Sequence, residues 1–395
     1  MPDNRSFERG HAMAQPVILA FGGTATWIRK PFEALAAHAS VIAVTPRDPL
    51  DWLREHGNAN EGRQALPAGF NASSLLAPFG WASSIMSAFQ PALWRRALAS
   101  NELTEHDVQA VFVASPHYFP LVRAIVGRVP VYYYAADSYR DYPGWDALAM
   151  TNAERSMVQA ASRSFFVSDA MAMRAADEYG VAPEKTAVSM NATGEEFLDA
   201  GSSSPSYDEV AAQLASLPRP IVAIIGAVSY RLDFALLTKC ADSPHVGSML
   251  FVGPDVDIAM APDEAARLAQ LRRHPKCRFV GARPHAELPV WNSLSDVALI
   301  PYRRSDLNHF CSPMRLFDHL ASGRPVVSND ACHQVRRFEH LVGIGATDEE
   351  VLQKLEDACA GTGAGKSNAR EAVRNGHLWK HRAQAIYEAL CRTAP

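Results

Sequence analysis

The chain of 395 residues has no cysteine before Cys240, and its six cysteines form no Cys-x-x-Cys pair. This spacing argues against a disulfide framework or a zinc site and favours free thiols in a reducing compartment. The net charge is −4 with no long basic tract, so nucleic acid is not expected as a partner. No apolar run reaches the ~20 residues of a membrane-spanning helix, and residues 1–15 lack the apolar core of a signal peptide. We therefore expect a cytoplasmic protein with a disordered tail over residues 1–15.

Several enzyme motifs are also missing. The chain contains no Gly-x-Gly-x-x-Gly, so dinucleotide binding is not supported. It has no Asp-x-Asp pair at the end of an expected strand to indicate a metal site, and no fixed-period repeat. The apolar fraction of 48% and the charged fraction of 20% are those of an ordinary globular protein. Its length suits two domains.

Short apolar runs alternate with helical stretches along the chain. Strands are expected at residues 17–21, 40–44, 108–114, 129–134 and 164–167, then at 221–225, 249–252, 277–280, 297–300 and 325–327. This rhythm predicts an α/β fold of two Rossmann-like, doubly wound domains, residues 16–200 and 221–376. The Ser- and Pro-rich residues 201–220 are expected to link them, and a helix in 377–395 to pack back on the first domain. Ligands of such sheets bind at the carboxyl ends of strands, here in the cleft between the domains.

The segment from Cys311 to Asp330 is the most informative part of the chain. Ser312 is expected to cap a helix that begins at Pro313, and Gly323 to end that helix in the left-handed conformation. Arg315 adds a guanidinium to the exposed N–H groups of the helix N-terminus, which is what a diphosphate needs. A surface ion pair with Asp318 is the alternative interpretation of Arg315.

The motifs, in their order and spacing, resemble those of GT-B fold glycosyltransferases. The most similar group is the bacterial enzymes that build capsules, teichuronic acids and exopolysaccharides. The matching segments are Trp27-Ile-Arg-Lys-Pro31, Tyr134-Ala-Ala-Asp137, Gly226-Ala-Val-Ser-Tyr-Arg-Leu-Asp233, Phe251-Val-Gly-Pro254, Phe279-Val-Gly-Ala-Arg283, Ala298-Leu-Ile-Pro-Tyr302 and, most specifically, residues 312–327. The resemblance implies a UDP- or GDP-sugar donor in the second domain and a glycan acceptor, free or polyprenyl-diphosphate-linked, in the first. It implies no cofactor and no metal.

The resemblance also implies which residues form the site. Arg315 would bind the diphosphate, and Asp318 would face the ribose. Arg283 and Tyr302 would line the base and phosphate region. The other donor-side positions are Gly226, Ala227, Gly253, Ser312, Pro313 and Met314. The acceptor-side candidates are Gly22, Gly23, Trp27 and Arg29, for which the end of a strand and packing at the start of a helix are alternative explanations.

The choice of catalytic base follows from a departure from the family pattern. Retaining relatives carry a Glu-x7-Glu pair, and here the second position is Asp318 but the first is Phe310. The chain is also similar to the xanthan-type glucuronosyltransferase, an inverting enzyme, in which an aspartate at the place of Asp137 is the base. The residues alone favour a turn or N-cap role for Asp137, whereas the resemblance favours the base. A second departure is Met190-Asn-Ala-Thr-Gly194, where relatives usually show Pro-Asn-Gly-Val-Asp.

Residues 70–96 gather many apolar side chains, followed closely by a basic pair, Arg95-Arg96. Such a patch beside an acceptor cleft would suit peripheral membrane contact, although a domain helix with a buried apolar face is the favoured alternative. The expected function is transfer of a hexosyl or glycuronosyl group, with inversion, during surface-polysaccharide synthesis. Three alternatives stay open: a nucleotide-sugar epimerase or hydrolase, a retaining transferase, and a non-catalytic glycan-binding scaffold.

Overall fold

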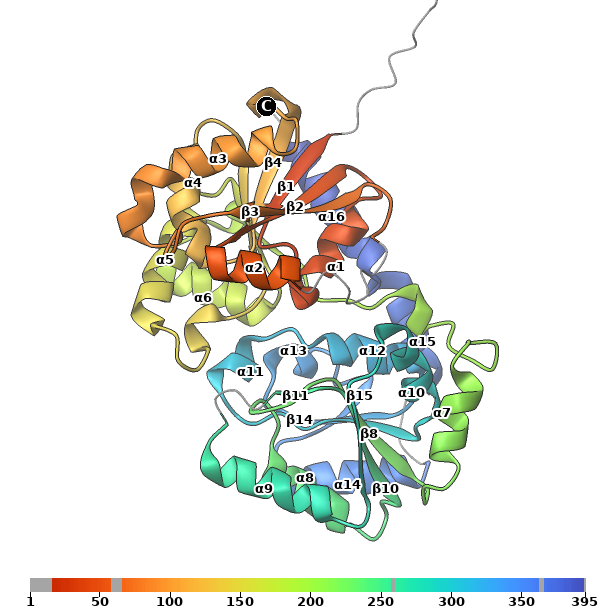
Figure 1. Ribbon diagram of the computed structural model, residues 1–395. Helices are drawn as coiled ribbons and strands as arrows, with labels where there is room; N and C mark the ends of the chain where they lie inside the picture. The colour runs from red at the N-terminus through yellow and green to blue at the C-terminus, as the bar shows by residue number, and fades with distance from the viewer. Residues whose placement is uncertain (1–15, 58–65, 257–259, 362–365, 394–395) are drawn as a thin grey trace, which may run out of the picture.

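The computed structural model describes residues 16–57, 66–256, 260–361 and 366–393. Two α/β units lie one above the other, each with a parallel sheet covered by helices (Figure 1). The first sheet has the strand order β3-β2-β1-β4-β5-β6-β7, and the second β12-β10-β8-β13-β14-β15. This architecture confirms the two Rossmann-like, doubly wound domains that the alternating pattern predicts.

The N-terminal domain contains the first seven strands and six α-helices. Its strands are β1 (Val17–Phe21), β2 (Ser40–Arg47), β3 (Phe70–Leu76), β4 (Val108–Val113), β5 (Val131–Ala135), β6 (Arg163–Phe166) and β7 (Thr186–Val188). Its helices are α1 (Thr26–Leu35), α2 (Pro49–Gly57), α3 (Gln90–Ala99), α4 (Phe119–Ile125), α5 (Ala147–Ala160) and α6 (Asp169–Tyr179).

The C-terminal domain repeats the same plan. Its main strands are β8 (Ile221–Ile225), β10 (Ser248–Val252), β12 (Cys277–Gly281), β13 (Val297–Ile300), β14 (Val326–Asn329) and β15 (Val342–Gly345), and β9 (Val228–Ser229) pairs with β11 (Asp255–Val256). Its helices are α7 (Tyr207–Leu214), α8 (Phe234–Asp242), α9 (Pro262–Arg273), α10 (Leu288–Leu294), α11 (Asp306–Phe310), α12 (Met314–Ser322), α13 (His333–Arg336), α14 (Asp348–Cys359) and α15 (Lys366–Gly376). The chain closes with α16 (Trp379–Thr393).

The central strands form because their side chains are apolar on both faces. Strand β8 reads Ile-Val-Ala-Ile-Ile and is buried throughout, as a parallel strand between two helical layers requires. Its two faces even contribute to different cores, since Val222 and Ile224 pack in one cluster and Ile221, Ala223 and Ile225 in another. No helix among the described residues is long and apolar enough to cross a membrane.

The expected linker, residues 201–220, contains the short helix α7, whose Val210 and Leu214 pack with Trp291 in one core of the C-terminal domain. Residues 70–76 form strand β3 and not a helix, since they pair with β2 along its length. A polar, half-exposed strand of this composition has too little apolar periodicity to be recognised locally.

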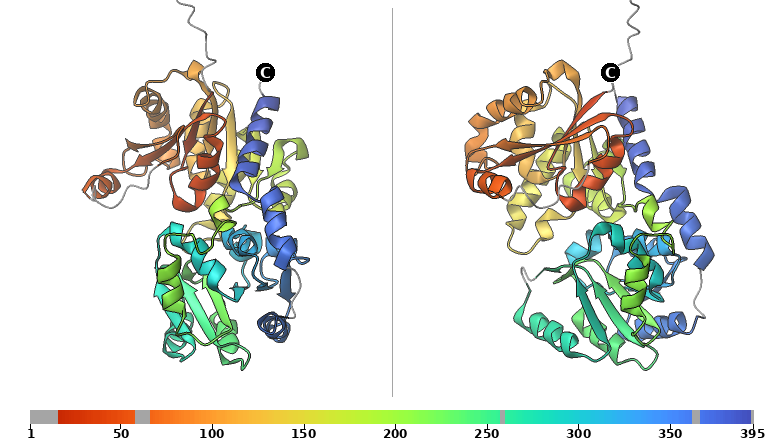
Figure 2. Two further views of the ribbon diagram at one scale, coloured as in Figure 1. Left: turned by 90° about the vertical axis from the view of Figure 1, so that its right-hand side faces the viewer. Right: turned by 45° about the vertical axis from the view of Figure 1, so that its right-hand side comes forward.

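Helix α16 belongs physically to the N-terminal domain, although it follows the whole C-terminal domain in sequence. It runs alongside the N-terminal domain (Figure 2). Four of its side chains lie in that domain's core: Ala383, Ile386, Ala389 and Leu390. The His38 and Tyr387 rings stack with centroids 5.2 Å apart. The chain therefore crosses between the domains twice.

Candidate active site

Two glycines bring the ends of β8 and β10 close together beneath an arginine. Gly253 has φ +155°, and a Cβ there would lie 2.1 Å from the Gly226 carbonyl oxygen. Gly226 has φ +118°, and a Cβ there would lie 2.8 Å from Nη2 of Arg315. Both positions need glycine, because a side chain would be strained and would displace a neighbour. The space beside the backbone is occupied by the Arg315 guanidinium.

Arg315 comes from the first turn of α12 and has an unused hydrogen-bond donor. Its Nη2 donates to the Ala227 carbonyl at 3.3 Å, and its guanidinium lies 5.3 Å from the centroid of the Tyr302 ring. Nη1 is buried and has no hydrogen-bond partner among the described residues. A buried donor without a partner is costly, so this atom points to a ligand oxygen. The alternative interpretation, an ion pair between Arg315 and Asp318, is not observed among the described residues, and Asp318 accepts a hydrogen bond from Thr193.

The start of α12 differs from its expected capping. The helix begins at Met314, and its N-cap residue, Pro313, supplies no side-chain cap. Ser312 lies one residue before the N-cap, and its Oγ accepts a hydrogen bond from the Asn191 backbone N–H at 3.0 Å. Asn191 also donates from Nδ2 to the Ser312 carbonyl at 2.6 Å. The far end is as expected, with Gly323 at φ +71°.

Asp318 faces the segment that connects the two domains. Its Oδ1 accepts a hydrogen bond from the Thr193 hydroxyl at 2.6 Å. Burial raises the pKa of Asp318 to about 7, against the lowering effect of the Thr193 hydrogen bond. The next residue, His319, is fully buried and contacts Asn292 Oδ1 through Nδ1 at 2.6 Å. Burial lowers the pKa of His319 to about 3, so its imidazole is neutral at physiological pH.

The two residues expected to line the base region have different roles in the structure. Tyr302 is 5% exposed and supports Arg315 from below, and burial raises its pKa to about 12. Arg283 is half-buried, with its guanidinium 5.8 Å from the Trp291 ring centroid. Its Nε is buried and has no hydrogen-bond partner among the described residues. The buried Nε of Arg283 is therefore available to donate to a ligand.

The acceptor-side candidates lie at the end of β1 and in α1. Gly22 has φ +80°, and a Cβ there would meet the Tyr118 ring at 3.0 Å. Gly23 is packed closely, since a Cβ would meet Phe32 at 3.2 Å. Arg29 forms an ion pair with Glu33 one turn further along α1, at 2.6 Å. The backbone of Trp27 lies in the first turn of α1, but its side chain is outside the described part of the structure.

Helix α1 lies at the end of the N-terminal domain nearest the C-terminal domain (Figure 1). Burial raises the pKa of Asp318 on α12, and the positive charge of Lys30 on α1 opposes that rise. Burial lowers the pKa of His285, just before α10, and the charge of Lys30 lowers it further.

Asp137 follows β5 and lies at the boundary between the domains, where it is 7% exposed. Its Oδ1 accepts from the Ser138 N–H at 3.0 Å, and its Oδ2 from the Tyr142 hydroxyl at 2.7 Å. Arg231 of the C-terminal domain forms an ion pair with the same Oδ2 at 3.3 Å. The short 3-10 helix after it, η4 (Tyr139–Asp141), has Ser138 as its N-cap residue and no side-chain cap. Asp137 therefore does not cap this helix.

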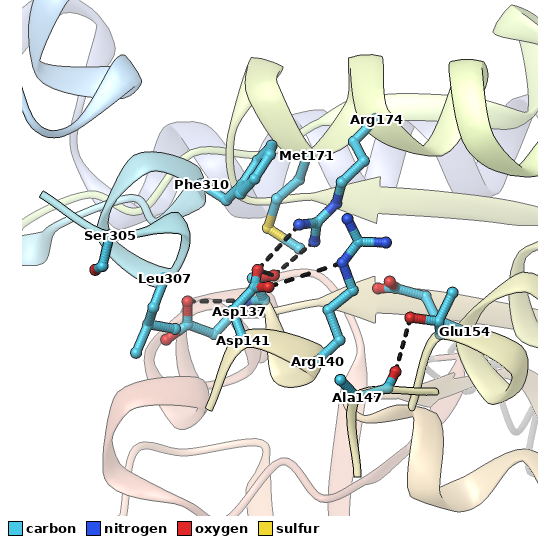
Figure 3. Close-up of polar contacts among 12 residues, drawn as sticks. Asp137, Arg140, Asp141, Ala147, Glu154, Met171, Arg174, Ser305, Leu307 and Phe310 are labelled. Atoms are coloured by element: carbon cyan, nitrogen blue, oxygen red, sulfur yellow. Dashed lines mark hydrogen bonds and ion pairs between the residues drawn. The ribbon is translucent and has the colours of Figure 1, made fainter. Parts of the chain in front are cut away.

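Phe310, at the position of the missing carboxylate, is covered by the N-terminal domain. The Arg174 guanidinium of α6 lies 3.9 Å from the centroid of the Phe310 ring. Arg174 also donates to Ser138 Oγ at 2.5 Å and to Asp141 Oδ2 at 3.0 Å. Figure 3 shows Phe310 and Arg174 side by side next to Asp137 and Asp141. A phenyl ring at this position offers no group for a nucleophilic or basic role.

Four residues outside the predicted set contribute to the site: Asn191, Thr193, Arg174 and Arg231. Two of them lie in the altered segment 190–194, whose departure from the family pattern was the only sequence indication of a special role. Arg231 lies in the motif that opens the second domain. The sequence around Arg174 does not indicate its hydrogen-bond partners, Asp141 and Ser138, which lie 33 and 36 positions away.

Two facing Rossmann-like sheets with a ligand cleft at their carboxyl ends define the GT-B fold, and comparisons with known proteins agree. Residues 244–388 match the family model "Glycosyl transferase-like". A segment of 110 residues, 28% of this chain, is 30% identical to TuaH of Bacillus subtilis (strain 168), which is named as a teichuronic acid biosynthesis glycosyltransferase. That match spans 26% of TuaH.

Solved structures extend the likeness over the whole fold. HepE of Anabaena, in complex with UDP and glucose, superposes with a TM-score of 0.69 at 15% identity, covering 95% of this chain and 99% of that one. Sucrose-phosphate synthase of Thermosynechococcus elongatus gives 0.67 at 16% identity, covering 96% and 100%. WaaG, a glycosyltransferase involved in lipopolysaccharide biosynthesis, gives 0.60 at 16% identity, covering 94% and 99%. The chain has the GT-B fold, as the sequence motifs indicated.

Proposed function

We propose that this protein is a glycosyltransferase that moves a sugar from a nucleotide-diphosphate donor to a glycan acceptor. The observation that carries the proposal is the Arg315 guanidinium, which lies against Gly226 at the end of β8. Its Nη1 is buried and has no hydrogen-bond partner in the part of the chain that the structure describes. A guanidinium with a free donor beside a helix N-terminus suits a diphosphate. UDP is the favoured nucleotide, because HepE was solved in complexes with UDP and with UDP-glucose.

We further propose an inverting reaction with Asp137 as the general base. The acceptor hydroxyl attacks the anomeric carbon and gives its proton to the Asp137 carboxylate, while the bond from that carbon to the diphosphate breaks. The electron pair leaves with the diphosphate, whose charge Arg315 stabilises. Phe310 supports this assignment, since the carboxylate of the retaining pattern is replaced by a ring packed under Arg174. Neither a cofactor nor a metal takes part in the proposed reaction.

The acceptor in this proposal is lipid-linked, and the N-terminal domain meets a membrane surface through its acceptor side. Two segments there expose large apolar side chains: Phe79 is 58% and Ile85 89% exposed between β3 and α3, and Leu148 is 71% exposed at the start of α5. Trp81 of the first segment and Trp145, just before α5, contact the 3-10 helix η3 (Pro116–Tyr118) beside the end of β1, through ring pairs 5.2 and 4.7 Å apart. Exposed apolar groups beside an acceptor cleft suit a polyprenyl chain at a bilayer surface.

The test combines binding and turnover. A thermal-shift series with nucleoside diphosphates should show stabilisation by UDP in the wild type and its loss in Arg315→Ala. Asp137→Asn should keep the UDP-induced shift and lose transfer by about 10²- to 10⁴-fold, the usual contribution of a general base. Wild-type turnover in Asp137→Asn would refute the base. Rapid donor consumption without acceptor would favour a hydrolase or epimerase, and no shift with any nucleotide would favour a binding scaffold.

A further inference from the structure

Arg231 is held rigidly within the C-terminal domain and extends one nitrogen out of it. It lies between β9 and α8, in the same segment as Gly226. Its Nε donates to Asn308 Oδ1 at 2.9 Å, and Nη2 donates to the Leu307 carbonyl at 3.3 Å. Asn308 in turn donates from Nδ2 to the carbonyls of Arg231 at 2.9 Å and Arg303 at 2.8 Å. These contacts fix the guanidinium plane and leave Nη1 as the group that faces the other domain.

The Nη1 group meets Asp137 of the N-terminal domain. The Arg231 and Asp137 side chains are 24% and 10% exposed, and Nη1 lies 3.3 Å from Oδ2. The other groups around the guanidinium are a neutral amide and a carbonyl oxygen, so the carboxylate is the partner that compensates its buried charge. Removal of either partner would leave the other as an uncompensated charge at the domain boundary.

The ion pair completes a three-donor arrangement around the Asp137 carboxylate. Oδ1 accepts from Ser138 N–H, and Oδ2 accepts from the Tyr142 hydroxyl and from Arg231. A carboxylate offers about four acceptor positions, so one remains on Oδ1. The first two donors belong to the loop that follows Asp137 itself, and only Arg231 comes from the other domain. Without Arg231 the carboxylate would have one fewer restraint on its rotation.

We propose that Arg231 is a positioning residue that couples closure of the two domains to orientation of the catalytic base. When the domains close, Arg231 contacts Oδ2 and turns the remaining lone pair of Oδ1 toward the acceptor hydroxyl. Gly226, beneath the proposed diphosphate, lies five positions before Arg231 in the same loop, so the loop that holds the donor also orients the base. This inference rests on the proposed function, because it assigns Asp137 the base role.

A double-mutant cycle at Arg231 and Asp137 tests the coupling. Arg231→Gln should lower kcat by about ten- to a hundredfold, part of the contribution of a general base, and leave the calorimetric Kd for UDP unchanged. Arg231→Lys should restore part of kcat, because an ammonium can still pair with the carboxylate. In the Asp137→Asn background, Arg231→Gln should add little further loss. The proposal would be overturned if the kcat loss of the double variant equalled the product of the losses of the two single variants. A loss of UDP affinity in Arg231→Gln would also overturn it.

A second ion pair between the domains provides the matched control. Arg337, after α13, pairs with Asp169 of α6 at an exposed position, with its side chain 54% exposed. Arg337→Gln removes an arginine–aspartate contact between the same two domains away from the proposed base. It should leave kcat within about twofold of wild type, as expected for a surface pair. An equal loss of kcat in both arginine variants would overturn the positioning role in favour of a general effect on the domain interface.

Domain separation can be measured without any turnover. Spin labels, one on an exposed site of each domain, report the distance by double electron–electron resonance with UDP present. Arg231→Gln and Asp137→Asn should each broaden the distance distribution toward longer values, and the double variant should broaden it no further. If wild-type protein turns over no donor, the proposed function fails while this result still tests the contact. Wild-type distances in both single variants would show that the ion pair does not hold the domains.

Discussion

Asp318→Asn should stabilise the protein above neutral pH and have little effect in acid. The carboxyl of Asp318 is half-buried, accepts the Thr193 hydroxyl at 2.6 Å, and has its pKa raised by burial to about 7. Asparagine has almost the same shape and keeps a carbonyl oxygen for the Thr193 hydroxyl. The substitution therefore removes the ionisation and preserves the hydrogen bond.

The size of the effect follows from the shift of the Asp318 pKa. The rise from 3.8 to about 7 corresponds to a cost of about 4 kcal/mol for ionising the folded state, an upper limit because the side chain is partly solvated. The folded pKa lies above the unfolded one, so the associated stability is fully present below about pH 4 and is lost as pH rises to about 7. Relative to wild type, the free energy of unfolding of Asp318→Asn should rise across this window and then level off.

Urea unfolding of both proteins at a series of matched pH values measures this difference. Other titrating groups cancel, because they are common to the two chains. Thr193→Val is a useful companion, since loss of a hydrogen bond that lowers the Asp318 pKa should move the window to higher pH. A difference that does not vary with pH, or one that favours wild type above pH ~7, would refute the reasoning.

Three further substitutions test separate parts of the structure. Arg315→Ala should weaken UDP binding by at least about tenfold in calorimetry, which is the value of one charge-assisted hydrogen bond. Arg315→Lys should recover part of the affinity. Equal UDP affinity in wild type and both variants would exclude the diphosphate role. Gly253→Ala should lower the free energy of unfolding by more than about 1 kcal/mol in urea, because its Cβ would lie 2.1 Å from the Gly226 carbonyl oxygen. Ile386→Asp should destabilise the N-terminal domain by several kcal/mol, about the cost of a buried unpaired charge. Hydrogen exchange, measured separately for the two domains, should increase in the N-terminal domain. An increase in the C-terminal domain alone would contradict this prediction.

The fold followed from local apolar patterns wherever those patterns were strong. Strand β8 is a run of five apolar residues, and the structure buries all of them at the bounds that the sequence predicts. Gly323 likewise ends α12 with a left-handed φ, because a helix terminus is decided by the residues within one turn of it. Strand β3 was not recognised because its exposed residues interrupt the alternation that identifies a strand.

Local rules failed where a distant partner competed for a polar group. Ser312 has the residue type and position of a helix cap, but its hydroxyl is bound by the Asn191 backbone N–H, 121 positions away in sequence. The helix begins one residue later than its local capping signal indicates, and only the three-dimensional arrangement brings Asn191 to the Ser312 hydroxyl. The linker shows the same limit, since the packing of α7 against Trp291 depends on a residue that is far away in sequence.

The sequence by itself determined the two-domain GT-B architecture, the glycines at the strand ends, and the position of Arg315 in the first turn of α12. These features depend on short-range periodicity and on backbone conformations that few residues can adopt. The tertiary structure alone decided that Asp137 pairs with Arg231, that Asp318 faces Thr193, and that Phe310 lies under Arg174. Each of these contacts joins residues more than 90 positions apart, and a polar or aromatic side chain carries no local information about which distant partner the fold will bring to it.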